Sequence, residues 1–455
     1  MTAYQNCIAE RSAARPAAHI LGKTGVLTCW LRKLIADVDK MQTAKPFQPE
    51  IENLQSLIEG NADLRMLASA MFSEIPNEAP YGEDPTGRRQ VRSYHHMLTL
   101  FNVIMMEVAP TWDMDQYATG LLGLPFTAVV AWPMATPSGR AFFLRKEVNE
   151  KLKLILDAWR DELLMTSKSL RVIHVGENGW LCRASLTALE RDANAPGSTW
   201  HSFSELFECN PEGDPIHWGF RSWDDFFTRQ FRDIDSIRPV GQPKRDEWLV
   251  SACESRPYAL QTNVKAYDTF WLKGNHYSVK EILGCHELSD SFVGGTIFQG
   301  FLTLTSYHRW CSPVSGHIVA TKIINGTYFS EPASAGFGSP LGPDPSGPDR
   351  SQVFITQVAT RALIFIRAPQ PIGLMCAIFV GMSDVSSCEI AKRFRSDLPS
   401  PVRKGEEIGT FRHGGSSYCL LLRKGLKLAW VPEAMPREDG HNLQVRSELA
   451  YAYAD

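Results

Sequence analysis

The sequence has no excess of charge of one sign, no paired cysteines and no internal repeat. Its 47 lysines and arginines nearly balance 50 aspartates and glutamates, for a net charge of -3. We therefore expect no nucleic-acid partner and no strong attraction to anionic lipid. The 10 cysteines are scattered singly, without a C-x-x-C pair. We expect no zinc framework and no other metal site, and a reducing compartment.

The distribution of charged and apolar residues also predicts neither a secretory signal peptide nor a clear membrane span. Charged residues such as Glu10 and Lys23 interrupt the first 25 residues, so we predict a cytoplasmic protein without a signal peptide. Residues 116–139 carry no charge and are long enough on paper to cross a bilayer, but they include three prolines. We interpret this stretch as a buried hairpin between helices and expect no stable membrane span.

The chain has 455 residues, 44% of them hydrophobic, which is enough for a sizeable core and two or three domains. Apolar residues recur at three- and four-residue spacing from Ile51 to Leu67 and from Phe143 to Trp159, and segment 88–108 is similar. This spacing predicts amphipathic helices. Turn residues cluster at 194–198, where the helical pattern ends.

Beyond residue 200 the pattern changes to short β-branched and aromatic runs bounded by turn residues. One short helix is expected first, from Trp223 to Arg232, with Ser222 and Asp225 in capping-box spacing. The predicted strands are 297–305, 317–324, 352–358, 361–367 and 374–381. The predicted fold class is α+β, with an N-terminal tail at 1–45, a helical domain at 46–200 and a mainly β core at 201–455.

The candidate reactive residue lies in the segment Phe411-Arg-His-Gly-Gly-Ser-Ser-Tyr418. The hydroxyl of Ser416 can attack the carbonyl of Gly415 if the turn is strained, because glycine has no Cβ to forbid the required backbone angles. The product is an ester; elimination gives dehydroalanine, and loss of ammonia leaves a pyruvoyl group at the new N-terminus. By itself, however, such a tetrapeptide is more often a tight turn between strands.

Other segments, in a fixed order, surround this one. They are Phe220–Arg229 with Arg238-Pro239, Lys273–Ser278, Tyr307–Pro313 with Gly316, Gly326–Ser330, Val380–Glu389 and Gly405–Phe411. Together they resemble the phosphatidylserine decarboxylase family, most specifically its Y-H-R-x-H-x-P-x-x-G segment, over residues 215–425. The resemblance implies a self-cleaving carboxy-lyase, cut between Gly415 and Ser416, whose covalent cofactor is a pyruvoyl group made from Ser416.

The first 200 residues and the segment Ser251–Ser255 resemble a narrower group of fungal members, L-tryptophan decarboxylases of the psilocybin pathway among them. This resemblance implies decarboxylation of a free aromatic L-amino acid, tryptophan to tryptamine, in secondary metabolism, through a Schiff base to the pyruvoyl group. It also implies that the cleaved α and β chains stay associated, and it leaves a homo-oligomer open. The alternative is decarboxylation of phosphatidylserine to phosphatidylethanolamine.

Two departures from the family pattern bear on self-cleavage. Glu254 stands where the family has the aspartate of an Asp-His-Ser set, and its longer carboxylate can still orient a base. Cys311 replaces the second histidine of Y-H-R-x-H, and a thiol with a pKa of roughly 8.5 is a poor general base. The group that takes the proton of Ser416 therefore stays open between His308, Cys311 and His413.

Further roles are expected around this centre. His308 is our candidate for the acid that protonates the carbanion after carbon dioxide leaves. Arg309 and Glu389 are expected to form either a structural ion pair or substrate contacts. The other candidate substrate contacts are Ser417, His413 and Trp310, although His413 also fits a purely structural strand-end histidine.

Two hypotheses come from other classes of protein. If Cys311 prevents self-cleavage, the chain would be a non-cleaving scaffold or binding protein of the same fold. Residues 17–24 fit a loose phosphate-loop pattern, but the residues before them are polar and basic instead of forming a buried strand. Nucleotide binding is therefore the weaker hypothesis.

Overall fold

The structure, a computed structural model, describes residues 24–41, 45–78, 81, 90–113, 122–196, 198–268, 276–339, 342–343, 351–385, 387–437 and 440–453. The phosphate-loop pattern, apart from its last residue, lies outside these ranges, as do the first three residues of the segment Lys273–Ser278, which resembles the family.

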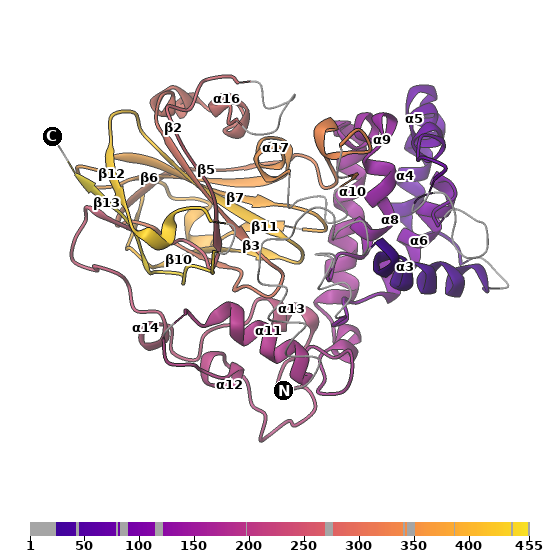
Figure 1. Cartoon of the computed structure of the whole chain (residues 1–455), viewed down its shortest axis with the longest axis horizontal. Coiled ribbons are helices and arrows are strands. Elements are labelled where there is room, and N and C mark those ends of the chain that lie inside the picture. The colour runs from indigo at the N-terminus through magenta and orange to yellow at the C-terminus, as the bar shows by residue number, and fades with distance from the viewer. Residues whose placement is uncertain are drawn as a thin grey trace.

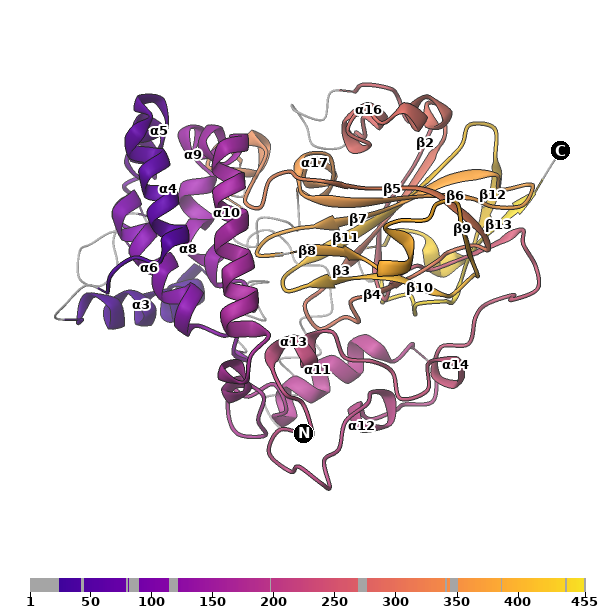
Figure 2. The ribbon, with the colours of Figure 1, turned by 180° about the vertical axis from the view of Figure 1, so that it is seen from behind.

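Helices fill one side of the molecule and the strands of the sheet fill the other (Figure 1; Figure 2 shows the reverse side). The predicted apolar stripe is confirmed: Ile51, Leu54 and Ile58 of one helix and Leu64 of the next are buried. The side chain of Asn61 caps the second helix and separates the two. The longer helices are α3 (Thr24–Asp39), α4 (Pro49–Gly60), α5 (Ala62–Ser73), α6 (Tyr94–Glu107), α8 (Pro125–Met134), α9 (Pro137–Phe143), α10 (Lys146–Trp159) and α11 (Arg183–Ala193).

The uncharged stretch that we predicted as a buried hairpin contains helix α8. Every residue from Pro125 to Met134 is buried, so the burial is confirmed and the hairpin is wrong for this part. Pro125 occupies the first helical turn, where its missing N–H costs no helical bond, and Pro133 lies near the end. Among the described residues, no helix is long and apolar enough to cross a membrane.

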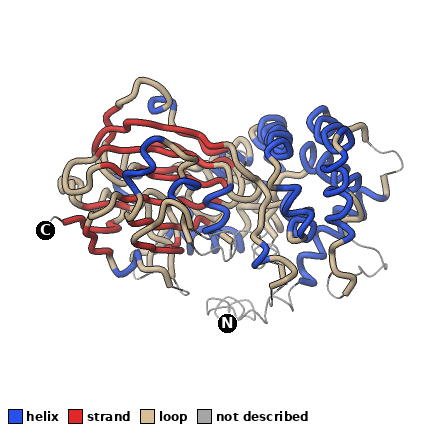
Figure 3. The backbone as a smooth tube through the Cα atoms, turned by 90° about the horizontal axis from the view of Figure 1, so that it is seen from above, coloured by secondary structure: helices blue, strands red, loops and turns tan. Residues whose placement is uncertain are grey.

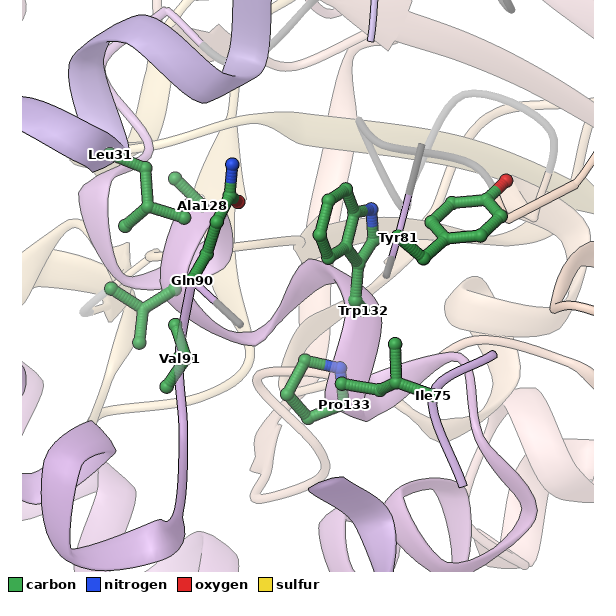
Figure 4. A pocket seen from close by; sticks show the side chains of 9 residues that line it. Leu31, Ile75, Tyr81, Gln90, Val91, Ala128, Trp132 and Pro133 are labelled. Carbon is green, nitrogen blue, oxygen red and sulfur yellow. The ribbon is translucent and has the colours of Figure 1, made fainter. Parts of the chain in front are cut away.

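A small apolar cavity lies between α3, α8 and the chain before α6 (Figure 4). It encloses about 10 Å³, which is space for about one water molecule. We therefore attribute it to packing and not to a ligand. Its lining residues are Leu31, Ile75, Tyr81, Gln90, Val91, Ala128, Val129, Trp132 and Pro133.

Helix α10 continues into a π-helical turn, and shorter helices then lead to the sheet. The predicted helix from Trp223 to Arg232 ends at Phe227, because the chain turns away after Thr228 closes the last helical bond to Asp224. The short elements are η1 (Arg160–Leu164), η2 (Ser167–Val172), α12 (Phe203–Leu206), α13 (Trp223–Phe227), α14 (Ile234–Ile237), α16 (Val279–Ile282), η3 (Glu287–Phe292), η4 (Ala333–Ala335), α17 (Gln352–Val358), η5 (Lys392–Phe394) and η6 (Pro432–Ala434).

The strands form a seven-stranded antiparallel sheet and two three-stranded sheets; they gather on one side of the molecule (Figure 3). The large sheet has the order β2-β3-β11-β7-β6-β5-β9, and the small ones are β4-β10-β8 and β1-β13-β12. The strands are β1 (Trp248–Val250), β2 (Arg256–Thr262), β3 (Thr296–Leu302), β4 (Arg309–Cys311), β5 (Gly316–Ile324), β6 (Arg361–Arg367), β7 (Leu374–Gly381), β8 (Ser387–Ile390), β9 (Ser400–Val402), β10 (Glu407–Arg412), β11 (Ser416–Leu422), β12 (Lys427–Trp430) and β13 (Glu448–Tyr453).

Four of the five predicted strands are confirmed as β3, β5, β6 and β7, whereas 352–358 is helix α17. Its residues are nearly all buried, so the segment lacks the polar face that marks an amphipathic helix, and its β-branched composition resembles a strand. The α+β class is confirmed.

The helices pack mainly against segments that connect the strands, whereas the strands of the large sheet belong to two other apolar clusters. Side chains of α6, α8 and α10 pack in the same apolar cluster as Leu304, Tyr307 and Phe329 from the β half. Helix α3 also joins this cluster, although it lies within the predicted tail. The domain boundaries near residues 45 and 200 stay predictions.

Candidate active site

Ser416 is the first residue of β11, an interior strand of the large sheet. It pairs with Leu302 of β3 on one side and Gly381 of β7 on the other. The residue is fully buried, and its Oγ has no hydrogen-bond partner in the described part of the chain. A buried, unsatisfied hydroxyl is costly, and a chemical role is one of the reasons for which a native protein keeps such a group.

Two glycines precede Ser416, and they differ in environment. Gly414 has a φ of +92°, and a Cβ there would lie 2.4 Å from the carbonyl oxygen of Ser383. A Cβ on Gly415 would meet no atom within 4 Å. The glycine whose backbone freedom the turn requires is therefore Gly414, and not Gly415 as expected from the motif.

The carbonyl oxygen of Gly415 accepts a hydrogen bond from the backbone N–H of Met382, at 3.1 Å. Met382 directly follows β7, whose last residue, Gly381, pairs with Ser416. The next residues, through Val385, form a turn that Val385 closes by donating its N–H to the Met382 carbonyl. The carbonyl of Gly415, which is the predicted cleavage point, thus points at the start of this turn.

His413 lies in a buried charged cluster just before the glycines. Its Nε2 is 3.2 Å from Oδ1 of Asp224, in α13. Both carboxylate oxygens of Asp224 accept hydrogen bonds from Nη1 of Arg412, and Nε of Arg412 is 3.0 Å from Glu389. Burial raises the pKa of Asp224, but His413 and Arg412 outweigh it and bring the pKa to about 2. Asp224 is therefore a carboxylate at neutral pH.

Burial lowers the pKa of His413, although Asp224 partly opposes this shift. The ring also contacts the aromatic rings of Trp159 and Phe227, with centroids 6.2 and 5.7 Å away. At neutral pH His413 is thus a neutral imidazole beside a carboxylate, a state in which it can accept a proton.

His308 is fully buried and stacks on Phe227 at 4.1 Å. Burial, followed by the charge of Arg229, lowers its pKa well below the usual value. Backbone groups of Thr303 and Ser306 favour its charged form more weakly, and neither ring nitrogen makes a hydrogen bond of good geometry. Its carbonyl accepts the N–H of Phe411 at 3.0 Å, so His308 lies beside the strand that leads to the cleavage point.

Cys311 is buried in β4, where burial raises the pKa of its thiol to about 12 despite the opposing effect of Arg446. The thiol is therefore protonated at neutral pH. This charge state does not favour Cys311 as the base, which was one of three candidates.

Glu254 is also buried, and its Oε1 lies 2.5 Å from Nε of Arg238. The N–H of Val445 donates to the same oxygen at 3.3 Å. Burial raises the pKa of Glu254, with Arg238 opposing. Among the described residues, no hydrogen bond or ion pair joins Glu254 to Ser416, His308 or His413, so its predicted role in self-cleavage stays a prediction.

Ser417 faces the opposite side of the sheet from Ser416, in a cluster of buried polar groups. Its hydroxyl accepts from Nε2 of Gln299 at 2.7 Å and donates to the carbonyl of Gly300 at 3.0 Å. Nε2 of Gln299 also donates to Thr356 of α17 at 2.9 Å, and the hydroxyl of Tyr277 donates to Oε1 of Gln299. The cluster anchors the strand next to the cleavage point.

Trp310 and Arg309, neighbours of His308, occupy structural positions. The Trp310 ring stacks on Phe379 at 4.0 Å and an interplanar angle of 3°. The predicted pair of Arg309 with Glu389 is wrong, because β10 lies between their strands. Arg309 pairs with Glu407 at 2.9 Å, and Glu389 pairs with Arg412. Substrate contact by Trp310, Ser417 or His413 stays a prediction.

A polar groove of about 340 Å³ lies over α13. Its lining includes Asn210, Arg221, Gln230 and Arg309, but not Ser416, His308 or His413. Within the described ranges, no three His, Cys, Asp or Glu side chains are placed to hold a metal ion.

The residues at the cleavage point fit a serine-derived pyruvoyl group. The orphaned Oγ of Ser416 is buried, the space beside Gly415 is open, and the carbonyl between them is oriented by Met382.

Asp224, Met382 and Asp384 lie within segments that resemble the family, but the sequence alone assigned them no role. For the two aspartates the available signal was an acidic residue in an otherwise apolar run, whereas Met382 acts through its backbone N–H and offered none. The contacts that define their roles come from segments distant in the sequence.

Two profiles of the phosphatidylserine decarboxylase family match the chain, at residues 48–189 and 223–439. A decarboxylase named iboD from Amanita muscaria is 38% identical, over 66% of this chain and 83% of that protein. An L-tryptophan decarboxylase from Psilocybe cyanescens is 38% identical, over 68% of this chain and 70% of its own length. The L-tryptophan decarboxylase of Psilocybe cubensis is 36% identical, over 73% of each chain.

Proposed function

Because the chain belongs to the phosphatidylserine decarboxylase family and is a carboxy-lyase, we propose that it cleaves itself between Gly415 and Ser416 and decarboxylates a free amino acid. The observation that carries the proposal is the buried Ser416 Oγ, which has no hydrogen-bond partner among the described residues and follows an oriented carbonyl at the start of the interior strand β11. A tight structural turn would not require an unsatisfied hydroxyl at this position.

The base for self-cleavage is His413, held by Asp224. Of the three candidates, it is the one beside a carboxylate, at 3.2 Å. It is neutral at pH 7 because burial lowers its pKa, whereas Cys311 keeps its proton. A histidine oriented by a carboxylate is the arrangement that activates serine in other enzymes.

The pyruvoyl group, once formed, supplies an electron sink for the loss of carbon dioxide. His308 has a neutral imidazole that stacks on the buried ring of Phe227, and its carbonyl bonds the N–H of Phe411. Because burial lowers its pKa well below the usual value, His308 is unprotonated at neutral pH and has to take up a proton during the reaction before it can donate one. We assign it the final protonation because it lies beside the strand that leads to Ser416.

The two chains made by cleavage stay associated. The C-terminal chain carries β11, β12 and β13, and β11 is bonded along all seven residues to β3 and β7. Every residue of β11 is buried, so separating the chains would expose a complete strand of the core.

Tryptophan is the substrate we favour. Two similar proteins are named L-tryptophan decarboxylases. The equally similar iboD is named only as a decarboxylase, so a small panel of amino acids has to be tested. Phosphatidylserine is the second candidate, because the family profiles carry its name.

Intact-mass measurement of the purified chain tests self-cleavage. We expect a large fragment ending at Gly415 and a small fragment of residues 416–455 that resists N-terminal sequencing. S416A should stay a single chain, and S417A should still be cut. A wild-type chain that stays whole after long incubation would reject the proposal and favour the scaffold hypothesis.

Assays of the cleaved protein test the substrate. Carbon dioxide release from tryptophan, tyrosine, phenylalanine and glutamate should be compared with release from phosphatidylserine vesicles. Activity on a free amino acid without lipid supports the proposal, and activity that requires vesicles supports the alternative.

A further inference from the structure

The turn after β7 joins the helices to the cleavage point. Its residue Asp384 is fully buried and has a φ of +59°, a strained conformation for a residue other than glycine. Its Oδ2 accepts the N–H of Phe126 at 3.0 Å, and its Oδ1 accepts the N–H of Thr127 at 3.0 Å and the Thr127 hydroxyl at 2.8 Å. Such strain persists only where the surroundings enforce it.

These donors are the first N–H groups of helix α8. The residue before the helix, Leu124, has no side-chain acceptor, and Pro125 has no N–H to satisfy. Asp384 therefore caps α8 from a position 258 residues away in the sequence. The positive end of the helix dipole also favours a carboxylate there.

The same turn contacts the cleavage point at two atoms. Its first residue, Met382, donates its N–H to the Gly415 carbonyl at 3.1 Å. Its Ser383 carbonyl lies so close to Gly414 that a Cβ would be 2.4 Å away. Movement of the turn would thus move both the donor and the backbone that presents Gly415.

We propose that the Met382 N–H is an oxyanion donor for self-cleavage and that Asp384, by capping α8, is the positioning residue that holds this donor in place. The inference rests on the proposed self-cleavage. It gives the N-terminal helices a chemical role, because the donor keeps its place only while α8 is docked against the turn.

The first step of the proposed self-cleavage is an acyl shift from nitrogen to oxygen. The Ser416 Oγ forms a bond to the Gly415 carbonyl carbon, its proton passes to the base, and the carbonyl electron pair moves onto the oxygen bonded by Met382. Re-formation of the carbonyl breaks the bond from Gly415 carbon to Ser416 nitrogen, which takes up a proton, and an ester results. The Met382 N–H already bonds the carbonyl oxygen of the uncleaved peptide at 3.1 Å, and an oxyanion donor acts at about 2.7–3.1 Å from the position that this oxygen takes once it is charged.

The carboxylate form of Asp384 suits this task, because three donors point at its two oxygens. Burial raises its pKa to about 7 against the effect of Thr127 and Phe126. The groups that face it are these uncharged donors, and no charged side chain among the described residues contributes to the shift. Protonation would remove one acceptor and loosen the cap.

Time courses of cleavage, followed by intact mass after synthesis of the full chain, test this inference. D384N keeps the size of the side chain but leaves one donor without an acceptor. We expect it to slow cleavage about tenfold or more, since loss of an oxyanion donor slows reactions by about 10²–10³ and this donor would be displaced, not deleted. T127V removes one of the three donors and should give a smaller slowing.

N61A is the matched control. Asn61 caps α5 in the same way, by accepting from Asp63 and Leu64, but none of its bonds reaches the turn. It should lower the melting temperature of the full chain without changing the cleavage rate.

The pH dependence of the cleavage rate distinguishes a loss of donor positioning from a general loss of stability. Between pH 6 and 8 wild-type cleavage should quicken as Asp384 ionises, and D384N should lack this rise. The pKa of His413 is lowered from 6.5, so its titration falls at lower pH.

Wild-type protein that is never cleaved would overturn the proposed function itself. Wild-type protein that is cleaved, with D384N cut equally fast, or slowed no more than N61A, would overturn this inference alone.

Discussion

Asp224 is held by two basic residues, and this makes part of the stability of the fold sensitive to acid. Its pKa falls from 3.8 to about 2 in the folded chain. A carboxyl whose pKa is depressed on folding contributes stability above its unfolded pKa and loses it as the pH falls through the folded pKa. The contribution should therefore disappear between pH 4 and pH 2.

We expect D224N to lose about 2 kcal/mol of unfolding free energy at pH 7, as a pKa shift of this size implies. The loss relative to the parent should vanish near pH 2. Urea unfolding of S416A and of S416A/D224N, both intact chains, measures this difference at each pH. A loss of the same size at pH 7 and pH 2 would contradict the assignment.

Replacing His413 should slow self-cleavage more than replacing Cys311. General-base catalysis contributes about 10²–10⁴-fold, so H413N should slow cleavage by at least about 10²-fold, whereas C311A should be cut at nearly the wild-type rate. The fraction cleaved over time gives both rates. H96N, which removes another buried histidine in α6, controls for the loss of a buried ring, and slow cleavage of C311A alone would favour the thiol.

Gly414 should tolerate no side chain. G414A would combine a positive φ with a Cβ 2.4 Å from the Ser383 carbonyl; such strain costs about 1–3 kcal/mol. G425A is the matched control, because its φ is +79° and nothing lies within 4 Å of its Cβ. Thermal unfolding should place G414A clearly below G425A, and equal melting temperatures would show that the Ser383 contact is unimportant.

At the level of single residues, the sequence predicted Ser416 as the reactive residue but did not predict which residues form the site around it. Gly415 and Ser416 are recognised from a local motif. His308 and His413 are recognised because they lie in segments that follow the order found in the family. The partners Asp224 and Asp384 act through contacts 188 and 258 residues away in the sequence, and such contacts leave no local pattern. The same limit produced the wrong pairing of Arg309 with Glu389, since strand order was unknown.

Among the elements, α17 and β11 are joined by hydrogen bonds between buried amides and hydroxyls. Gln299 of β3 is the centre of this cluster and contacts Ser417, Thr356 and Tyr277. The sequence could not predict α17, because a helix buried on all sides shows no polar face. Strands β6 and β7 were predicted with their correct bounds, because turn residues flank each apolar run.

Q299L should destabilise the chain strongly by leaving several buried groups without partners. Each unsatisfied group costs about 1–3 kcal/mol, so we expect at least about 2 kcal/mol in urea unfolding of the S416A background. Q261L, on the neighbouring strand β2 and only half-buried, should have little effect. A similar small change in the free energy of unfolding of both variants would mean that the cluster contributes little to stability.

Over the whole molecule, the sequence indicated an α+β chain in two parts, and the division at residue 200 stays a prediction. Residues of α6, α8 and α10 share one apolar cluster with Leu304, Tyr307 and Phe329 of the β half, and Asp384 adds hydrogen bonds from the turn after β7 to α8. We expect S416A to unfold in a single transition.

If the chain cleaves itself as proposed, the position of β11 between β3 and β7 has a consequence for how the protein loses its structure. An uncut chain unfolds and refolds as one molecule, whereas the cut protein must reunite two molecules to rebuild the middle of its sheet. The melting temperature of the mature protein should therefore rise with protein concentration, while that of S416A should not. Once heated at high dilution, the mature protein should not recover, because its strand β11 will have diffused away.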